Sequence, residues 1–267
     1  MLIAFVFGTV VGSFLNVCIW RLPRDESLVK PGSHCPECDT LLRPRDLVPL
    51  LSFLWQRCRC RYCGAKISWR YFGVELLTGL YFVFTYWRFG FTLDTLQYAL
   101  FGAALIAIFF IDLEHYIIPD QLSLFGIGLG IAFDLIGLAT GAREPIFRIY
   151  SVPVPASIVG ALVSGFAFLA IAIISYYIFK KEGVGGGDIK LAAAIGANML
   201  LGQAFLSFFI AVFVGSVIGI ALIALKIKSR KDYVPFGPMM VVGALVSIFY
   251  GREIIRAWLV YSGLDVM

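Results

Sequence analysis

The chain has 267 residues, of which 60% are hydrophobic and 15% are charged, with a net charge of +5 and a mean hydropathy of +0.88. Soluble domains are usually about 45–50% apolar, so this composition excludes an ordinary soluble globular protein. Basic residues are not interleaved with aromatic ones on a polar surface, so we expect no nucleic-acid partner.

Apolar runs of about 17–25 residues recur along the chain, and this is the length that crosses a bilayer. They predict an all-α polytopic membrane protein of about eight transmembrane helices in contact with lipid. The first run has no basic segment before it and no small-residue cleavage site after it, so we expect it to be retained. The sixth is short and rich in Ala and Gly, which favours a position within the bundle. The expected spans are 2–20, 72–88, 95–111, 120–138, 154–179, 188–202, 205–226 and 236–250.

One long segment, 21–71, interrupts the apolar pattern and carries five of the six cysteines. Cys35-x-x-Cys38 and Cys60-x-x-Cys63 are two pairs separated by 21 residues. Two such pairs are typical of a tetrahedral Zn²⁺ site. Four thiolates leave no open coordination position, so the zinc would be structural, and it would stabilise a segment that is short of apolar core.

Other interpretations of the cysteines remain open at this point. The thiols of segment 21–71 could be free or redox-paired. Cys58 could replace Cys60 as a ligand, although this breaks the two-residue spacing of the second pair. His34 could replace Cys35, but the second pair makes an all-cysteine set more natural. Cys18 lies inside the first span and is interpreted as a packing residue.

Basic residues concentrate in three connections and predict the orientation in the membrane. Segment 21–71 contains ten Lys and Arg residues, and the other two connections are 180–187 and 226–235. The positive-inside rule places these connections in the cytoplasm, and eight spans then put both termini outside. The expected organisation is a first transmembrane helix at 1–20, a small cytoplasmic zinc-binding loop domain at 21–71 and a seven-helix core at 72–267. The basic residues of the two shorter connections are Lys180, Lys181, Lys226, Lys228, Arg230 and Lys231.

Two aspartates fall at the cytoplasmic ends of spans in this topology. Asp112 ends the third span, and Asp188 opens the sixth. An acid at membrane depth faces a cavity or a partner. Two neighbouring carboxylates do not both ionise easily, so one can take a proton from water while the other donates to a carbonyl. The pattern therefore indicates aspartic proteolysis.

Alternatives exist for each acidic position. An aspartate at a span end can cap a helix, and we interpret Asp120, which follows Pro119, in this way. Capping does not suit Asp112, because a negative charge at a helix C-terminus is unfavourable. The glycine-rich run before Asp188 does not match the G-x-G-x-x-G nucleotide-binding pattern, because Asp188 occupies the last position.

Residues around Asp188 are candidates for substrate contact. Gly185, Gly186 and Gly187 have no Cβ, so their backbone can adopt positive φ and let an extended substrate approach closely. Lys190 could hold a substrate carbonyl or tune the aspartates, and snorkelling to the interface is equally compatible with its position.

Glu75, near the cytoplasmic start of the second span, is a functional candidate as an intramembrane acid. The positive end of a helix dipole could equally account for it. Asn16, in the first span, is interpreted as a hydrogen-bonding bridge between helices.

Motifs in a fixed order along nearly the whole chain carry a family resemblance. They are Gly12-Ser13-Phe14-Leu15-Asn16, the four-cysteine segment, Val74-Glu75-Leu76, Asp112 with Ile118-Pro119-Asp120, Gly185-Gly186-Gly187-Asp188 and Pro235-Phe236-Gly237-Pro238. With these the chain resembles bacterial type IV prepilin peptidases, also called leader peptidase/N-methyltransferases, which are G-x-G-D membrane aspartic proteases. One departure is Cys58, where family members often have glycine.

The resemblance implies a multi-pass protein of the bacterial inner membrane with an active site facing the cytoplasm. Asp112 and Asp188 would be the catalytic pair. The activity implied is cleavage after a glycine in the basic leader of a prepilin or pseudopilin. Methylation of the new N-terminus by S-adenosylmethionine would follow. We expect the methyl donor to bind between the zinc loop and the bundle, with Glu75 as a contact for its positive charge. The alternatives are a G-x-G-D protease without methylation and a proton-coupled transporter.

Overall fold

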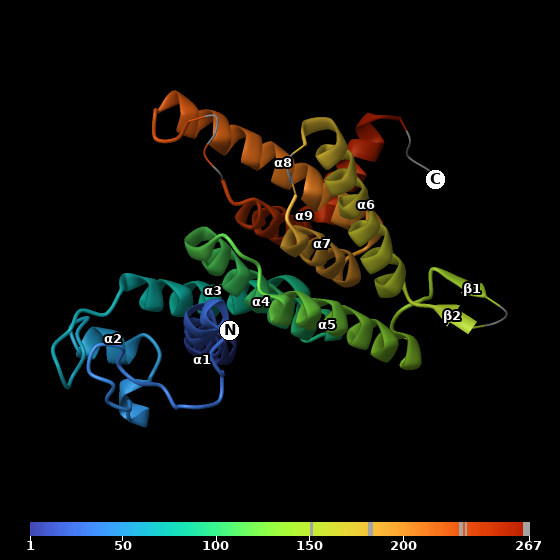
Figure 1. The fold of residues 1–267 in the computed structure, drawn as a ribbon. Coiled ribbons are helices and arrows are strands. Elements are labelled where there is room, and N and C mark those ends of the chain that lie inside the picture. Colours follow the sequence, from blue (N-terminus) through green and yellow to red (C-terminus); the bar gives the residue numbers. More distant parts are fainter. Residues whose placement is uncertain (150–151, 181–183, 230–231, 233, 264–267) are drawn as a thin grey trace. The chain divides into compact units, whose positions relative to one another are not determined.

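The structure, a computed structural model, describes the chain apart from residues 150–151, 181–183, 230–231, 233 and 264–267. It has two compact units, Met1–Ile111 and Asp112–Met267, whose elements are labelled in Figure 1. Three of the basic residues used to predict the topology, Lys181, Arg230 and Lys231, lie outside the described residues.

The first unit is organised around two helices in close contact, α1 (Leu2–Arg21) and α3 (Trp69–Phe89). A Cβ atom at Gly12 would lie 2.8 Å from Glu75 Cα, and one at Gly8 would lie 2.8 Å from Phe82 Cβ. Small residues therefore bring the two backbones together, as is usual between helices in membranes. Between them, the chain forms the 3₁₀ turns Leu22–Arg24 and Pro44–Asp46 and the short helix α2 (Leu51–Trp55).

The second unit begins within α4 (Leu93–His115). It continues with α5 (Asp120–Ala139), the antiparallel strands β1 (Phe147–Ile149) and β2 (Val152–Val154), α6 (Ala156–Phe179), α7 (Gly186–Asn198), α8 (Leu201–Ala224) and α9 (Gly237–Tyr261). In this unit α7 packs against both α5 and α6 (Figure 1). Gly196 of α7 faces Gly160 of α6 so closely that a Cβ on either would collide with the other backbone.

Six helices among the described residues are long and apolar enough to cross a membrane: α1, α4, α5, α6, α8 and α9. This confirms an all-α membrane protein. The expected second span corresponds to α3, which carries more charge. The expected sixth span corresponds to α7, which has only 13 residues. At 1.5 Å per residue it is about 20 Å long, against about 30 Å of hydrocarbon.

Several predicted boundaries differ from the structure by a few residues, and the ends of the sixth and last spans show why. The expected sixth span, 188–202, ends early because the backbone is extended at Met199, with ψ 159°. The Asn198 amide instead donates to Gly126 O at 2.7 Å and to Ala194 O at 2.9 Å. The last expected span, 236–250, continues as helix to Tyr261. Most of α7 is buried, as its composition indicated.

Candidate active site and metal site

Asp112 lies in the last turn of α4 and is only 4% exposed. Its carboxylate meets the N-terminus of α9, where the backbone of Gly237 forms a hydrogen bond with it. A Cβ atom at Gly237 would lie 2.5 Å from Asp112 Oδ2. The first backbone N–H groups of a helix have no partner within the helix and carry partial positive charge, so this position suits a carboxylate.

Asp188 is the third residue of α7 and is 7% exposed. Its Oδ2 accepts a hydrogen bond of 3.0 Å from the backbone N–H of Gly185, which is the N-cap residue. Asp188 therefore caps its own helix. It is also close enough to Asp112 for its charge to act on that carboxyl group.

Ile118, in the connection between α4 and α5, contacts the start of α7, which carries Asp188, and the start of α9, which faces Asp112. A Cβ atom at Gly187 would lie 2.9 Å from Ile118 Cβ, and one at Gly237 would lie 3.2 Å from Ile118 Cδ1. Glycine is thus required at both positions by close packing. The structure brings Asp112 and Asp188 together in one unit, as the sequence predicted, and their catalytic role stays a prediction.

The glycines before Asp188 do not adopt the conformation that we expected. Gly185 is extended, with φ −74° and ψ 154°, and Gly186 and Gly187 form the first turn of α7. None of the three has positive φ, because a helix start needs ordinary helical dihedrals. Substrate approach is still sterically possible at Gly186, where a Cβ atom would meet nothing within 4 Å.

Lys190 and Asp120 form an ion pair, so the sequence interpretation of Asp120 was wrong. Pro119 is the N-cap of α5, and Asp120 follows it without a capping hydrogen bond. Instead the Lys190 ammonium donates to both carboxylate oxygens of Asp120 at 2.6 Å. This bond joins the starts of α5 and α7, which are 70 residues apart in sequence.

The four predicted metal ligands lie together in the first unit. The sulfur atoms of Cys35, Cys38, Cys60 and Cys63 are all within 4.8 Å of one another. Cys35 Sγ and Cys63 Sγ are 3.9 Å apart, close to the separation of about 3.8 Å expected from Zn–S bonds of about 2.3 Å in a tetrahedron. The cluster can therefore hold a metal ion.

The two C-x-x-C turns have the same backbone hydrogen bonds. Cys35 N–H donates to Thr40 O at 3.1 Å, and Cys60 N–H donates to Ala65 O at 2.8 Å. Within each turn the fifth residue, Asp39 or Gly64, has positive φ. Cys58 and His34 lie outside the four-sulfur cluster, as predicted.

The thiols differ in how readily they ionise. Hydrogen bonds with the side chain and backbone of Thr40 lower the pKa of Cys38 to about 7. Although a backbone hydrogen bond with Ala65 lowers the pKa of Cys63, burial and the neighbouring thiols raise it to about 12. Four adjacent thiolates repel one another, so a bound cation would be needed for all four to ionise.

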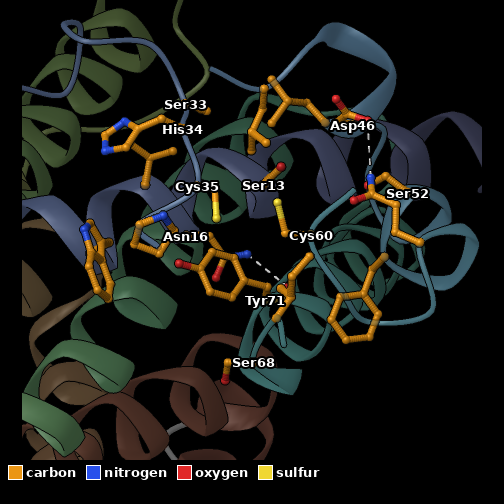
Figure 2. Close-up of a pocket in the computed structure, with 18 of the residues that line it drawn as sticks. Ser13, Asn16, Ser33, His34, Cys35, Asp46, Ser52, Cys60, Ser68 and Tyr71 are labelled. Atoms are coloured by element: carbon orange, nitrogen blue, oxygen red, sulfur yellow. Dashed lines mark hydrogen bonds between the residues drawn. The ribbon is translucent and has the colours of Figure 1, made fainter. Parts of the chain in front are cut away.

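A cavity of about 370 Å³ lies within the first unit, between α1, the start of α3 and the cysteine segment (Figure 2). Glu75, the predicted cofactor contact, lines it and is buried. Glu75 Oε2 accepts a hydrogen bond of 2.7 Å from the backbone N–H of Leu50, and the side chain of Ser13 also bonds it. Glu75 therefore also connects the loop to the helices.

Sequence reasoning missed Asp46, which organises the cysteine segment. Its carboxylate accepts hydrogen bonds from the Tyr62 hydroxyl at 2.9 Å and the Arg43 backbone at 3.1 Å, and it pairs with Arg61 at 3.0 Å. Burial opposes ionisation, but these hydrogen bonds and the charges of Arg61 and Arg45 hold the pKa of Asp46 below its usual value. No spacing pattern marks this residue. Gly237 was quoted only as part of a family motif, and its contact with Asp112 was not predicted, although the proline after it was a signal for a helix start.

Known protein families and individual proteins are similar to most of the chain. Residues 6–89 match the bacterial peptidase A24 N-terminal domain, and residues 99–220 match the type IV leader peptidase family. A "Prepilin leader peptidase/N-methyltransferase" of Bacillus subtilis (strain 168) is 34% identical, covering 96% of this chain and 97% of that protein. Proteins of the same name in Aeromonas salmonicida (strain A449), 33% identical over 96% of this chain and 93% of theirs, and Neisseria gonorrhoeae, 34% identical over 97% and 94%, are also similar. No solved structure matches.

Proposed function

Because the chain belongs to the type IV leader peptidase family, we propose that it removes the leader peptide from type IV prepilins or pseudopilins and then methylates the new N-terminus. The peptidase half of this proposal rests on one observation, the proximity of two buried aspartates. Asp112 faces the N-terminus of α9, and Asp188 lies in the first turn of α7. The substrate name comes from the relatives, which are called prepilin leader peptidases.

In this proposal the two aspartates share one proton. The ionised carboxylate takes a proton from the attacking water, and the protonated one donates to the scissile carbonyl. A backbone hydrogen bond orients each carboxyl group: Gly185 bonds Asp188, and Gly237 bonds Asp112. One hydrogen bond still leaves each carboxyl group acceptor capacity for water or substrate. Ile118 packs against both Gly187 and Gly237, the residues beside the two carboxyl groups.

The substrate would approach along the start of α7. The open space beside Gly186 admits a main chain there. Lys190 is held by Asp120, so it is a weaker candidate for binding a substrate carbonyl. The basic connections support an active site that faces the cytoplasm, by the positive-inside rule.

We assign the cysteine cluster to structural Zn²⁺. The spacing of the sulfur atoms and the matched turns fit four thiolate ligands. Zinc would fold segment 21–71 and so shape the wall of the cavity, which Cys35 and Cys60 line.

The cavity fits the methyl donor, S-adenosylmethionine, which when bound supplies an electrophilic methyl group on a sulfonium. Its volume is within the range of small-molecule sites. Glu75 provides negative charge for the positively charged donor, and Ser13 and Leu50 orient its carboxylate. A free α-amino group has a pKa of about 7.7–8.0, so positioning can supply much of the rate without a strong base.

The test of the peptidase is cleavage of a synthetic prepilin peptide by the purified full-length protein. Asp112→Asn and Asp188→Asn should each abolish cleavage, because one carboxylate cannot be both acid and base. Asp120→Asn is the matched control and should keep substantial activity, because Asp120 is half-exposed and only pairs with Lys190. An active Asp112→Asn variant beside an inactive Asp120→Asn variant would show that the pair was assigned wrongly.

Mass spectrometry of the cleaved pilin with labelled S-adenosylmethionine tests the second activity. Methyl incorporation that fails in Glu75→Gln while cleavage continues would support the cavity as the donor site. If the wild-type protein cleaves the prepilin but does not methylate it, the alternative of a G-x-G-D protease without methyltransferase activity is supported. A proton-coupled transporter would cut nothing.

A further inference from the structure

One polar atom in the wall of the cavity lacks a partner. Asn16 is 3% exposed, and its Nδ2 donates a hydrogen bond of 3.0 Å to the backbone oxygen of Tyr71. This bond joins α1 to α3, as expected, and Figure 2 draws it as a dashed line. Its Oδ1 is buried and has no hydrogen-bond partner among the described residues. A buried acceptor without a partner is costly, so a ligand donor that bonded Asn16 Oδ1 would relieve this cost.

Two of the acceptors that line the cavity differ in charge. Glu75 is an acid, whereas the Asn16 amide is neutral. Asn16 bonds the backbone of Tyr71, which precedes Glu75 by one turn of α3, so both acceptors belong to the region around the start of α3. A ligand that spans both would present a cation to Glu75 and a neutral donor to Asn16.

The chemistry of the proposed methyl donor selects one group for Asn16. Its sulfonium and ammonium are cationic and suit Glu75. A ribose hydroxyl both donates and accepts, so it does not require a partner that only accepts. The exocyclic amino group of adenine only donates, and the amide oxygen only accepts. Adenine is also flat and aromatic, and Trp20, Phe53 and Tyr71 line the same cavity.

Resting on the proposed methyltransferase function, we infer that Asn16 Oδ1 accepts a hydrogen bond from the exocyclic amino group of adenine. Asn16 is then an adenine-recognition residue of the methyl-donor site. Gly12 contributes to the same site. Its lack of a side chain lets α1 approach Glu75 and brings Asn16 to the start of α3.

The experiment measures binding of S-adenosylhomocysteine and S-inosylhomocysteine to the full-length protein in detergent by calorimetry. The inosine analogue has a carbonyl oxygen where adenine has the amino group. The wild-type protein should bind the adenine form about 10- to 100-fold more tightly, because the analogue leaves the Asn16 acceptor unpaired. Asn16→Leu should weaken binding of the adenine form by a similar factor and remove the preference.

Thr78→Val is the matched control. Thr78 is fully buried in α3 near Gly12, but its hydroxyl bonds Val74 O at 2.7 Å, within its own helix. It does not line the cavity, so its variant should keep the wild-type preference. Cleavage of a prepilin peptide by each variant reports whether it is folded.

The outcomes separate this inference from the function on which it rests. If the wild-type protein binds both compounds equally, adenine recognition by Asn16 is overturned. This result does not depend on any variant. Retention of the preference in Asn16→Leu overturns it as well. Absence of both S-adenosylhomocysteine binding and methylation in the wild-type protein overturns the methyl-donor site itself.

Discussion

Replacing Gly237 by alanine should impair cleavage mainly by displacing the Asp112 carboxylate. The new Cβ would lie 2.5 Å from Asp112 Oδ2, and ordinary contact begins at about 3.4 Å, so the carboxylate must move by about 0.9 Å. Because alanine keeps the backbone N–H at position 237, the change removes no hydrogen-bond donor and tests the steric effect. A misplacement of about 1 Å at a reacting group can cost about 100-fold in rate, which corresponds to about 2.7 kcal/mol.

The assay is cleavage of a prepilin peptide by purified Gly237→Ala protein, followed by methylation of a peptide that is already mature. Cleavage should fall by about 100-fold, whereas methylation should stay near the wild-type rate, because the proposed donor cavity lies in the other unit. Gly215→Ala is the control, since its Cβ would make an ordinary contact of 3.5 Å with Met239. A folded Gly237→Ala protein that cleaves within a few-fold of wild type would refute the steric argument.

Three further predictions concern metal and pH. The purified protein should contain about one zinc per chain. The paired change Cys35→Ser and Cys60→Ser should remove this zinc, whereas Cys58→Ser should keep it. Metal analysis that shows loss of zinc in Cys58→Ser would contradict the ligand set. Ionised Asp46, with its depressed pKa, stabilises the folded loop above the unfolded pKa of about 3.9, and this is lost as pH falls through the folded pKa. Asp46→Asn should therefore speed proteolysis of the loop at neutral pH, with the difference from wild type vanishing in acid; equal rates at neutral pH would count against this role. The cleavage rate should follow a bell in pH, because the aspartate pair must carry one proton, and a flat profile would argue against a shared proton.

The sequence predicted the features that depend on local composition. The first span was placed at 2–20 and α1 is Leu2–Arg21, because an uninterrupted apolar run fixes a helix by itself. The C-x-x-C spacing likewise located all four cluster cysteines. Hydropathy missed the end of α9, because Arg252, Glu253 and Arg256 continue the helix with charged residues.

Features that depend on distant segments were harder to predict. The partner of Asp120 is 70 residues away, and nothing local distinguishes an ion pair there from a cap. The same holds for Gly187, whose need for glycine comes from Ile118. The end of α7 at Asn198 has no Pro or Gly breaker next to it. Only the fold reveals that the Asn198 amide bonds carbonyl groups of two helices.

The position of Asp188 in the first turn of α7 makes the proposed active site sensitive to fraying of that helix. Its carboxylate is oriented by the N–H of Gly185, and the turn between them contains Gly186 and Gly187. Glycine is among the weakest helix formers, and terminal turns open at lower free energy than helix interiors. Heat should therefore release Asp188 before the bundle unfolds. Catalytic competence would then have a melting temperature of its own, below that of the protein.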